Sequence, residues 1–108
     1  MRVLLDECLP RKLGRLLVGH EVSTVQQAGW SGAVNGQLLR KMPGHFDAFI
    51  TVDQNIPAQQ NATALTFGVI VLRAPTNQLP DLAPLVPRML AALHTLRPGQ
   101  VVIISAEP

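Results

Sequence analysis

The chain has 108 residues, 47% of them hydrophobic, and this length accommodates one domain, residues 1–108, with a core of its own. The formal net charge of +2 is too small to indicate a histone-like nucleic-acid binder, and an aromatic content of 4% argues against a platform that stacks single-stranded bases. The single cysteine excludes an internal disulfide, and no apolar run approaches the roughly 18 residues of a membrane span. Since the N-terminus does not resemble a signal peptide, we expect a cytoplasmic protein with no membrane partner.

Short apolar runs alternate with helical patterns along the chain, which is typical of an α/β fold. Strands are predicted at residues 2–5, 21–25, 46–52, 67–72 and 101–105. Right-handed crossovers make such strands parallel and place helices on both faces of the sheet. The sequence therefore predicts a three-layer α/β/α domain with a mainly parallel sheet of five strands.

Three helices are expected between these strands. The first follows Pro10 and ends near Gly19, with Leu9, Leu13, Leu16 and Leu17 on its buried face. A short second helix carries Leu38, Leu39 and Met42 and stops at Pro43. A third begins near residue 84, where neighbouring prolines should distort its first turn, and residues 54–66 are helical at best.

The same five-residue pattern follows two of the predicted strands. Asp6-Glu7-Cys8-Leu9-Pro10 follows the first strand, and Asp53-Gln54-Asn55-Ile56-Pro57 follows the third. Proline suits the first position of a helix, so each pattern predicts a strand, a short loop bearing an Asp, and a helix. In a parallel sheet both loops lie at the carboxyl edge, where open α/β folds bind their ligands.

Carboxylates brought together at this edge point to a divalent cation. Mg²⁺ and Mn²⁺ are bound by a few carboxylates, waters and a substrate phosphate, and they can activate water. Asp6 and Asp53 are the candidate ligands, with Glu7 assisting. The alternative role for both aspartates is that of a helix N-cap. The alternative for Glu7 is that its side chain points along the dipole of the following helix. If Pro10 and Pro57 begin helices, however, the caps fall three residues past each Asp.

Other residues near this edge have open assignments. Arg73 and Asn77 are placed where a phosphate could be met, although an Arg that closes a strand is often only solvated. Cys8 is expected to be a small buried residue rather than an activated thiol, and Trp30 to pack in the core or on a partner. The sequence contains no phosphate-binding loop, serine-hydrolase elbow or zinc motif.

The chain resembles the small bacterial PIN-like proteins of the uncharacterised DUF type. The resemblance is carried by Leu4-Leu5-Asp6-Glu7, Gly29-Trp30-Ser31-Gly32, Asn35-Gly36-Gln37-Leu38-Leu39, Thr51-Val52-Asp53-Gln54-Asn55 and Val71-Leu72-Arg73-Ala74. It implies the strand order 3-2-1-4-5 and kinship with VapC-type toxins, which are Mg²⁺- or Mn²⁺-dependent ribonucleases neutralised by a small antitoxin. It also implies that the protein forms a homodimer.

Carried over from the resemblance, Asp6 and Asp53 match metal ligands of the first and third strands, and Asn55 falls where relatives have Asp or Asn. Relatives place acids at the start of the second helix, where this chain has Asn35-Gly36-Gln37. An amide contributes no negative charge to a cation site. Asn35 and Gln37 are therefore assigned, with Arg73 and Asn77, to substrate contacts.

Two main functions follow from these assignments, and a third possibility is an accessory DNA- or RNA-repair factor. The first is a metal-dependent ribonuclease that acts on RNA as the toxin of a toxin–antitoxin pair. The alternative is a catalytically weakened module that binds a partner protein or nucleic acid. The intact pair of aspartates favours the enzyme, and the amides at the second helix favour the module.

Overall fold

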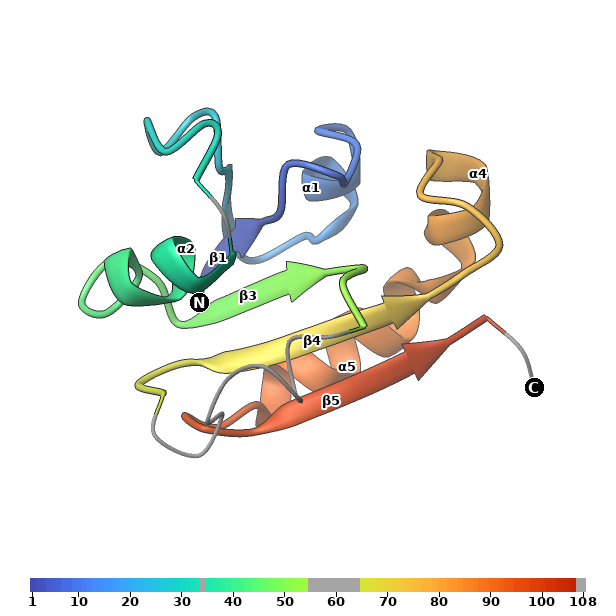
Figure 1. Cartoon of the computed structure of the whole chain (residues 1–108). Coiled ribbons are helices and arrows are strands. Elements are labelled where there is room, and N and C mark those ends of the chain that lie inside the picture. The colour runs from blue at the N-terminus through green and yellow to red at the C-terminus, as the bar shows by residue number, and fades with distance from the viewer. Residues whose placement is uncertain (34, 55–64, 107–108) are drawn as a thin grey trace.

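The structure, a computed structural model, describes residues 1–33, 35–54 and 65–106. Five parallel strands form one sheet in the order β2-β1-β3-β4-β5 (Figure 1). They are β1 (Arg2–Leu5), β2 (Glu21–Thr24), β3 (Ala48–Thr51), β4 (Gly68–Arg73) and β5 (Val101–Ser105). The predicted α/β class is confirmed, and each strand ends within two residues of its expected position.

The helices cover both faces of this sheet. They are α1 (Leu13–Leu16), α2 (Asn35–Lys41), α4 (Leu79–Leu82), the 3₁₀ turn η2 (Ala83–Leu85) and α5 (Val86–Thr95). Leu13, Leu82 and Met89 bury α1, α4 and α5 against one face, and Figure 1 shows α5 behind β4 and β5. Leu38 and Leu39 of α2 join the cluster on the opposite face. The sheet is therefore the middle of three layers.

The strand order differs from the expected 3-2-1-4-5 in the position of β3. This strand lies at the centre, between β1 and β4, and all four of its residues are buried. A strand without a polar face is stable only with neighbours on both sides and helices above and below. The more exposed β2 takes the edge instead. As a result β1 and β3 are direct neighbours, whereas the expected order would have put β2 between them.

The first helix is much shorter than predicted. It begins at Leu13 rather than Pro10 and has four residues, and Leu16, expected on the buried face, is 38% exposed. Pro10 instead closes a turn in which its carbonyl accepts the Leu13 N–H at 3.0 Å. The third helix begins as expected with a distorted segment, because η2 carries Pro84 and α5 follows with Pro87 in its first turn.

Residues 55–64 separate β3 from the segment that enters β4, and the expectation of a helical stretch there lies outside the described residues. In the part of the chain that is described, no helix is both long and apolar enough to cross a membrane.

Candidate functional site

The ends of β1 and β3 bring the two predicted aspartates to one edge of the sheet. Leu5 pairs with Ile50 in the parallel register, and the Asp6 N–H extends this ladder by donating to the Ile50 carbonyl at 3.0 Å. Asp53 follows the last residue of β3 by two positions. Both residues are only partly buried, so both reach solvent.

Thr51 connects the two aspartates. Its hydroxyl donates to Asp6 Oδ2 at 2.6 Å and accepts the backbone N–H of Asp53 at 3.0 Å. The side chain is fully buried, so this hydroxyl has no water to replace a lost partner. Two loops from distant parts of the sequence are thereby held in a fixed relation.

Asp6 does not cap the first helix, and the capping alternative is wrong for this residue. Its Oδ1 accepts the N–H of the next residue, Glu7, at 2.8 Å, and its carbonyl accepts the Leu9 N–H at 3.0 Å. The N-cap of α1 is Lys12, which makes no side-chain capping bond. These bonds belong to the loop after β1 and leave the carboxylate at the edge of the sheet.

Glu7 is bound to a loop rather than aligned with a helix dipole. Its Oε1 accepts the backbone N–H of Gly32 at 2.6 Å. Gly32 has φ of 81°, a conformation that glycine adopts without strain. The loop that contains Gly32 therefore lies beside the carboxyl edge of the sheet. Asp6, Glu7 and Arg11 are among the residues that line a cavity of about 310 Å³ here.

Cys8 is exposed, which corrects the expectation of a buried residue. Partial desolvation is the main cause that raises the pKa of its thiol above 9.0, and the charge of Asp6 and a hydrogen bond to Asp6 add to the effect. A raised pKa keeps the thiol protonated at neutral pH. Cys8 therefore stands beside the carboxylate as a weak donor, not as an activated nucleophile.

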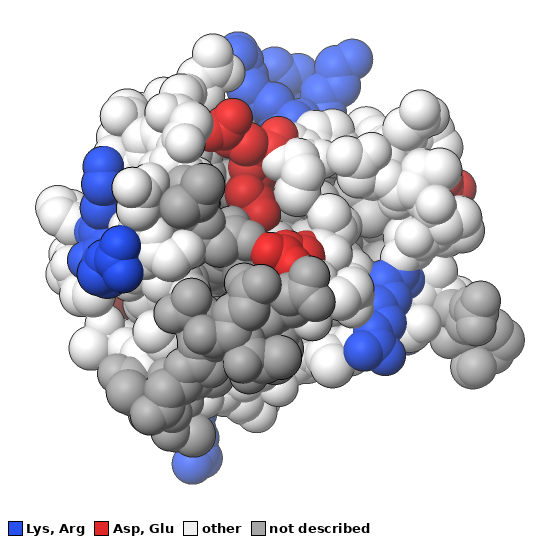
Figure 2. Space-filling model, viewed as in Figure 1, with Lys and Arg blue, Asp and Glu red and all other residues white. Residues whose placement is uncertain are grey.

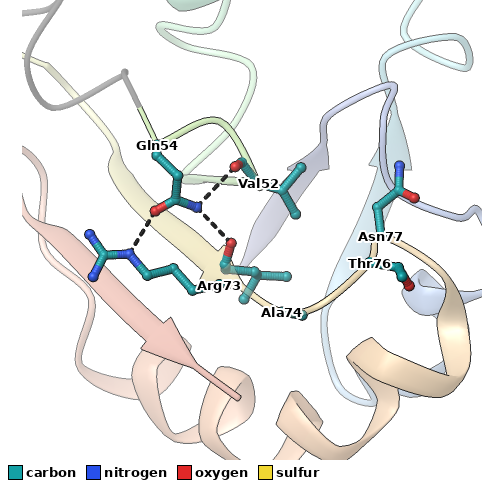
Figure 3. A pocket seen from close by; sticks show the side chains of 7 residues that line it. Val52, Gln54, Arg73, Ala74, Thr76 and Asn77 are labelled. Atoms are coloured by element: carbon teal, nitrogen blue, oxygen red, sulfur yellow. Dashed lines mark hydrogen bonds between the residues drawn. The ribbon is translucent and has the colours of Figure 1, made fainter. Parts of the chain in front are cut away.

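A second cavity, of about 490 Å³, lies at the ends of β3 and β4 (Figure 3). Its lining residues are Val52, Gln54, Leu72, Arg73, Ala74, Thr76 and Asn77. It contains two of the predicted substrate contacts, Arg73 and Asn77, and both are exposed. Arg73 Nε donates to Gln54 Oε1 at 2.7 Å, and Asn77 Nδ2 donates to the Cys8 carbonyl at 2.6 Å.

Two further predicted site residues lie on α2. Asn35 is the first residue of α2, and Gln37 is exposed within that helix. Asn55 lies outside the described residues. Trp30 packs at the edge of the core on the α2 side, with its ring edge-on to His45 and Phe46.

A cation held at this edge would have to keep most of its waters. Acidic atoms gather near the middle of the face in Figure 2. Among the described residues, no group of three or more His, Cys, Asp and Glu side chains is arranged to hold a metal ion. Asp6 and Asp53 supply two carboxylates, and Mg²⁺ is commonly held by one or two carboxylates with waters and phosphate oxygens.

Two residues of this edge were missed by sequence reasoning. Thr51 is a polar residue at the end of an apolar strand, and this contrast is a usable signal for a buried hydroxyl with a specific partner. Gln54 follows Asp53 in the repeated motif, but nothing in the sequence indicates that its amide spans two strands.

No protein-family model, curated protein or solved structure matches this chain. The resemblance to PIN-like proteins therefore stays a prediction. The functional assignment depends on the chemistry of the carboxyl edge itself.

Proposed function

We propose that this protein is a PIN-like domain that binds Mg²⁺ or Mn²⁺ through Asp6 and Asp53 and hydrolyses RNA phosphodiesters as a toxin restrained by a small antitoxin-like protein. The observation that supports it best is the Thr51 hydroxyl, which bonds to the Asp6 carboxylate and to the backbone of Asp53. Glu7 assists at the same edge, and the resemblance adds Asn55 to the ligand set. Asp6 and Asp53 would hold the cation, which would supply an activated water and neutralise charge on the phosphoryl group.

The protein's own residues orient the carboxylate of Asp6. Thr51 and the Glu7 N–H each donate to one of its oxygens. These neutral donors fix the position of the carboxylate but leave its negative charge in place for a cation. A ligand whose geometry is fixed before binding loses less conformational freedom when the ion arrives.

The second candidate is a binding module without catalysis. Glu7 favours it, because its carboxylate already accepts the Gly32 N–H at 2.6 Å and so is partly committed to holding a loop. The amide residues Asn35 and Gln37 add no charge where an acid would strengthen the cation site.

Cleavage of a mixed RNA pool in the presence of Mn²⁺ tests the enzyme. We expect wild type to cleave, and Asp6→Asn and Asp53→Asn each to lower the rate by at least about a hundredfold, since each removes a charged ligand. Glu21→Gln is the matched control, because it removes one negative charge from an exposed residue. Glu21 begins β2 and so lies at the amino edge of the sheet, away from the candidate site.

Calorimetric titration with Mn²⁺ should show the same pattern of weakened binding. Cleavage that persists in both aspartate variants would identify a contaminant or a different site. If wild type binds Mn²⁺ or RNA without cleaving, the binding module is the correct function.

A further inference from the structure

We infer that the cavity between the ends of β3 and β4 binds one nucleotide unit, with the phosphate at Arg73 and the nucleoside extending toward Asn77. This inference deepens the proposed function and rests on it for the choice of ligand. Binding in the cavity requires neither the cation nor cleavage, so the two proposals can fail separately.

Gln54 fixes the cationic end of the cavity. Its Nε2 donates to the carbonyls of Val52 at 3.0 Å and of Leu72 at 2.9 Å, which belong to neighbouring strand ends. The amide oxygen is thereby directed at Arg73 Nε. Figure 3 shows Gln54 and Arg73 together on one side of the cavity. A neutral amide thus positions the guanidinium without cancelling its charge.

The guanidinium keeps donors for an anion. Its Nε is occupied by Gln54, while the two Nη groups, with their four N–H donors, remain. Within the described residues, no carboxylate forms an ion pair with Arg73. The two Nη groups together can donate to two oxygens of one phosphate group.

The other end of the cavity suits a nucleoside. Asn77 and Thr76 lie on the side opposite Gln54 in Figure 3. The amide nitrogen of Asn77 is committed to the Cys8 carbonyl, which leaves its oxygen to accept a hydrogen bond from a ribose hydroxyl or a base. The thin apolar floor between the ends comes from Val52, Leu72 and Ala74.

The size and lining of the cavity favour a nucleotide over a bare anion. A volume of about 490 Å³ falls within the range of sites for small organic ligands. Inorganic phosphate would contact Arg73 and leave the apolar floor and Asn77 unused. A nucleoside monophosphate engages all three.

The test measures binding of 5′-UMP to the whole protein in EDTA by titration with NMR detection. Uridine and inorganic phosphate are the two reference ligands. We expect UMP to bind about tenfold more tightly than either, because a charge-assisted hydrogen bond contributes about one power of ten or more. Equal affinity for UMP and inorganic phosphate would overturn the inference.

Variants assign the phosphate end. Arg73→Ala should weaken UMP binding about tenfold and leave the affinity for uridine unchanged. Gln54→Leu should weaken UMP binding by a smaller factor, since the guanidinium remains but loses its hydrogen bond to Gln54. Arg73→Lys should not bind UMP with wild-type affinity, because an ammonium group does not replace the planar guanidinium. Arg97→Ala is the matched control, because Arg97 is exposed near the amino end of β5. UMP binding by Arg73→Ala at the wild-type level would contradict the site.

A 5′-phosphorylated tetrauridylate then identifies the source of the nucleotide. Tighter binding than UMP assigns the cavity to a strand, weaker binding assigns it to a free nucleotide, and either result retains a nucleotide unit at Arg73. Asp6→Asn should bind UMP as wild type does. Normal UMP binding without RNA cleavage would reject the ribonuclease alone, and cleavage without UMP binding would reject this cavity alone.

Discussion

A single buried hydroxyl organises the candidate cation site. Thr51 is fully buried at the end of β3, donates to Asp6 and accepts from the backbone of Asp53. The relation between the two loops thus depends on one oxygen atom. Sheet geometry alone brings both loops to the edge, but it does not fix how their side chains are turned.

Replacement of Thr51 by Val tests this role, because the two side chains have nearly the same shape. We expect Thr51→Val to lower the free energy of unfolding by about 1–3 kcal/mol, since a partly buried N–H and a carboxylate oxygen each lose a partner. It should also weaken Mn²⁺ binding. Urea unfolding and calorimetry measure the two effects.

Thr51→Ser is the control for that substitution, because it keeps the hydroxyl. It should retain cation binding although it loses a buried methyl group. Weak Mn²⁺ binding in Thr51→Ser with normal binding in Thr51→Val would show that the hydroxyl does not orient Asp6.

At the residue scale, the sequence was sufficient to predict which aspartates reach the edge but not how they are held. Asp6 and Asp53 each follow an apolar run, and parallel strands end together. The exposure of Cys8 could not be predicted from the sequence pattern. It depends on a turn closed by the hydrogen bond from the Leu9 N–H to the Asp6 carbonyl, and not on the start of a helix.

At the scale of elements, strand positions were predictable and strand order was not. A run such as Val101–Ser105 is apolar and β-prone wherever it lies in the sheet. The order depends on which strand is buried on both sides, and β3 has that property in all four residues. The helix after β1 could not be bounded from leucine spacing, because Gly14 and Pro10 interrupt the pattern that the leucines suggest.

Gly68 shows how closely a helix end can approach a strand. A Cβ at this position, the first of β4, would overlap the side chain of Leu96, which follows α5 and is 8% exposed. The close contact uses space that only glycine leaves open.

Gly68→Ala should therefore destabilise the protein by about 1–3 kcal/mol, the usual effect of overpacking a core. Combination with Leu96→Ala should cost less than the sum of the two single changes, because the smaller side chain relieves the overlap. Thermal or urea unfolding of the four proteins completes this cycle. Additive effects would mean that the overlap is relieved elsewhere.

On the scale of the whole molecule, the two edges of the sheet carry different groups of polar contacts. The candidate cation site and the cavity proposed to bind a nucleotide lie at the carboxyl ends of the strands. At the amino ends, Arg2 pairs with Asp47 at 3.3 Å and its backbone N–H donates to the same carboxylate at 2.9 Å. Changes at the amino edge should therefore alter stability without altering ligand binding.

The pH dependence of stability should reveal the Asp47 contacts. Hydrogen bonds from the Arg2 side chain and backbone hold the pKa of Asp47 below 3.8 in the folded protein. The stabilisation is complete above that value and is lost as the pH falls through the lower folded-state pKa. At neutral pH the free energy of unfolding of wild type should exceed that of Asp47→Asn by less than about 1 kcal/mol. The difference is small because the Arg2–Asp47 ion pair is half-exposed.

Urea unfolding of both proteins between about pH 2 and pH 6 measures this difference. The curves should converge at the acidic end of the range. Mn²⁺ and UMP affinities of Asp47→Asn at neutral pH serve as the control for the other edge, and they should equal those of wild type. A constant stability difference at every pH would show that the carboxylate is not the group that titrates.

The central place of β3 also determines when the candidate cation site can first form during synthesis of the chain. The hydroxyl of Thr51 meets a carboxylate that lies 45 residues earlier in the chain. Parallel neighbours cannot be joined by a tight turn, and such long-range pairings form slowly. A nascent chain that has emerged only as far as β2 holds Asp6 without Thr51 and Asp53, so the candidate cation site cannot form until β3 has been synthesised.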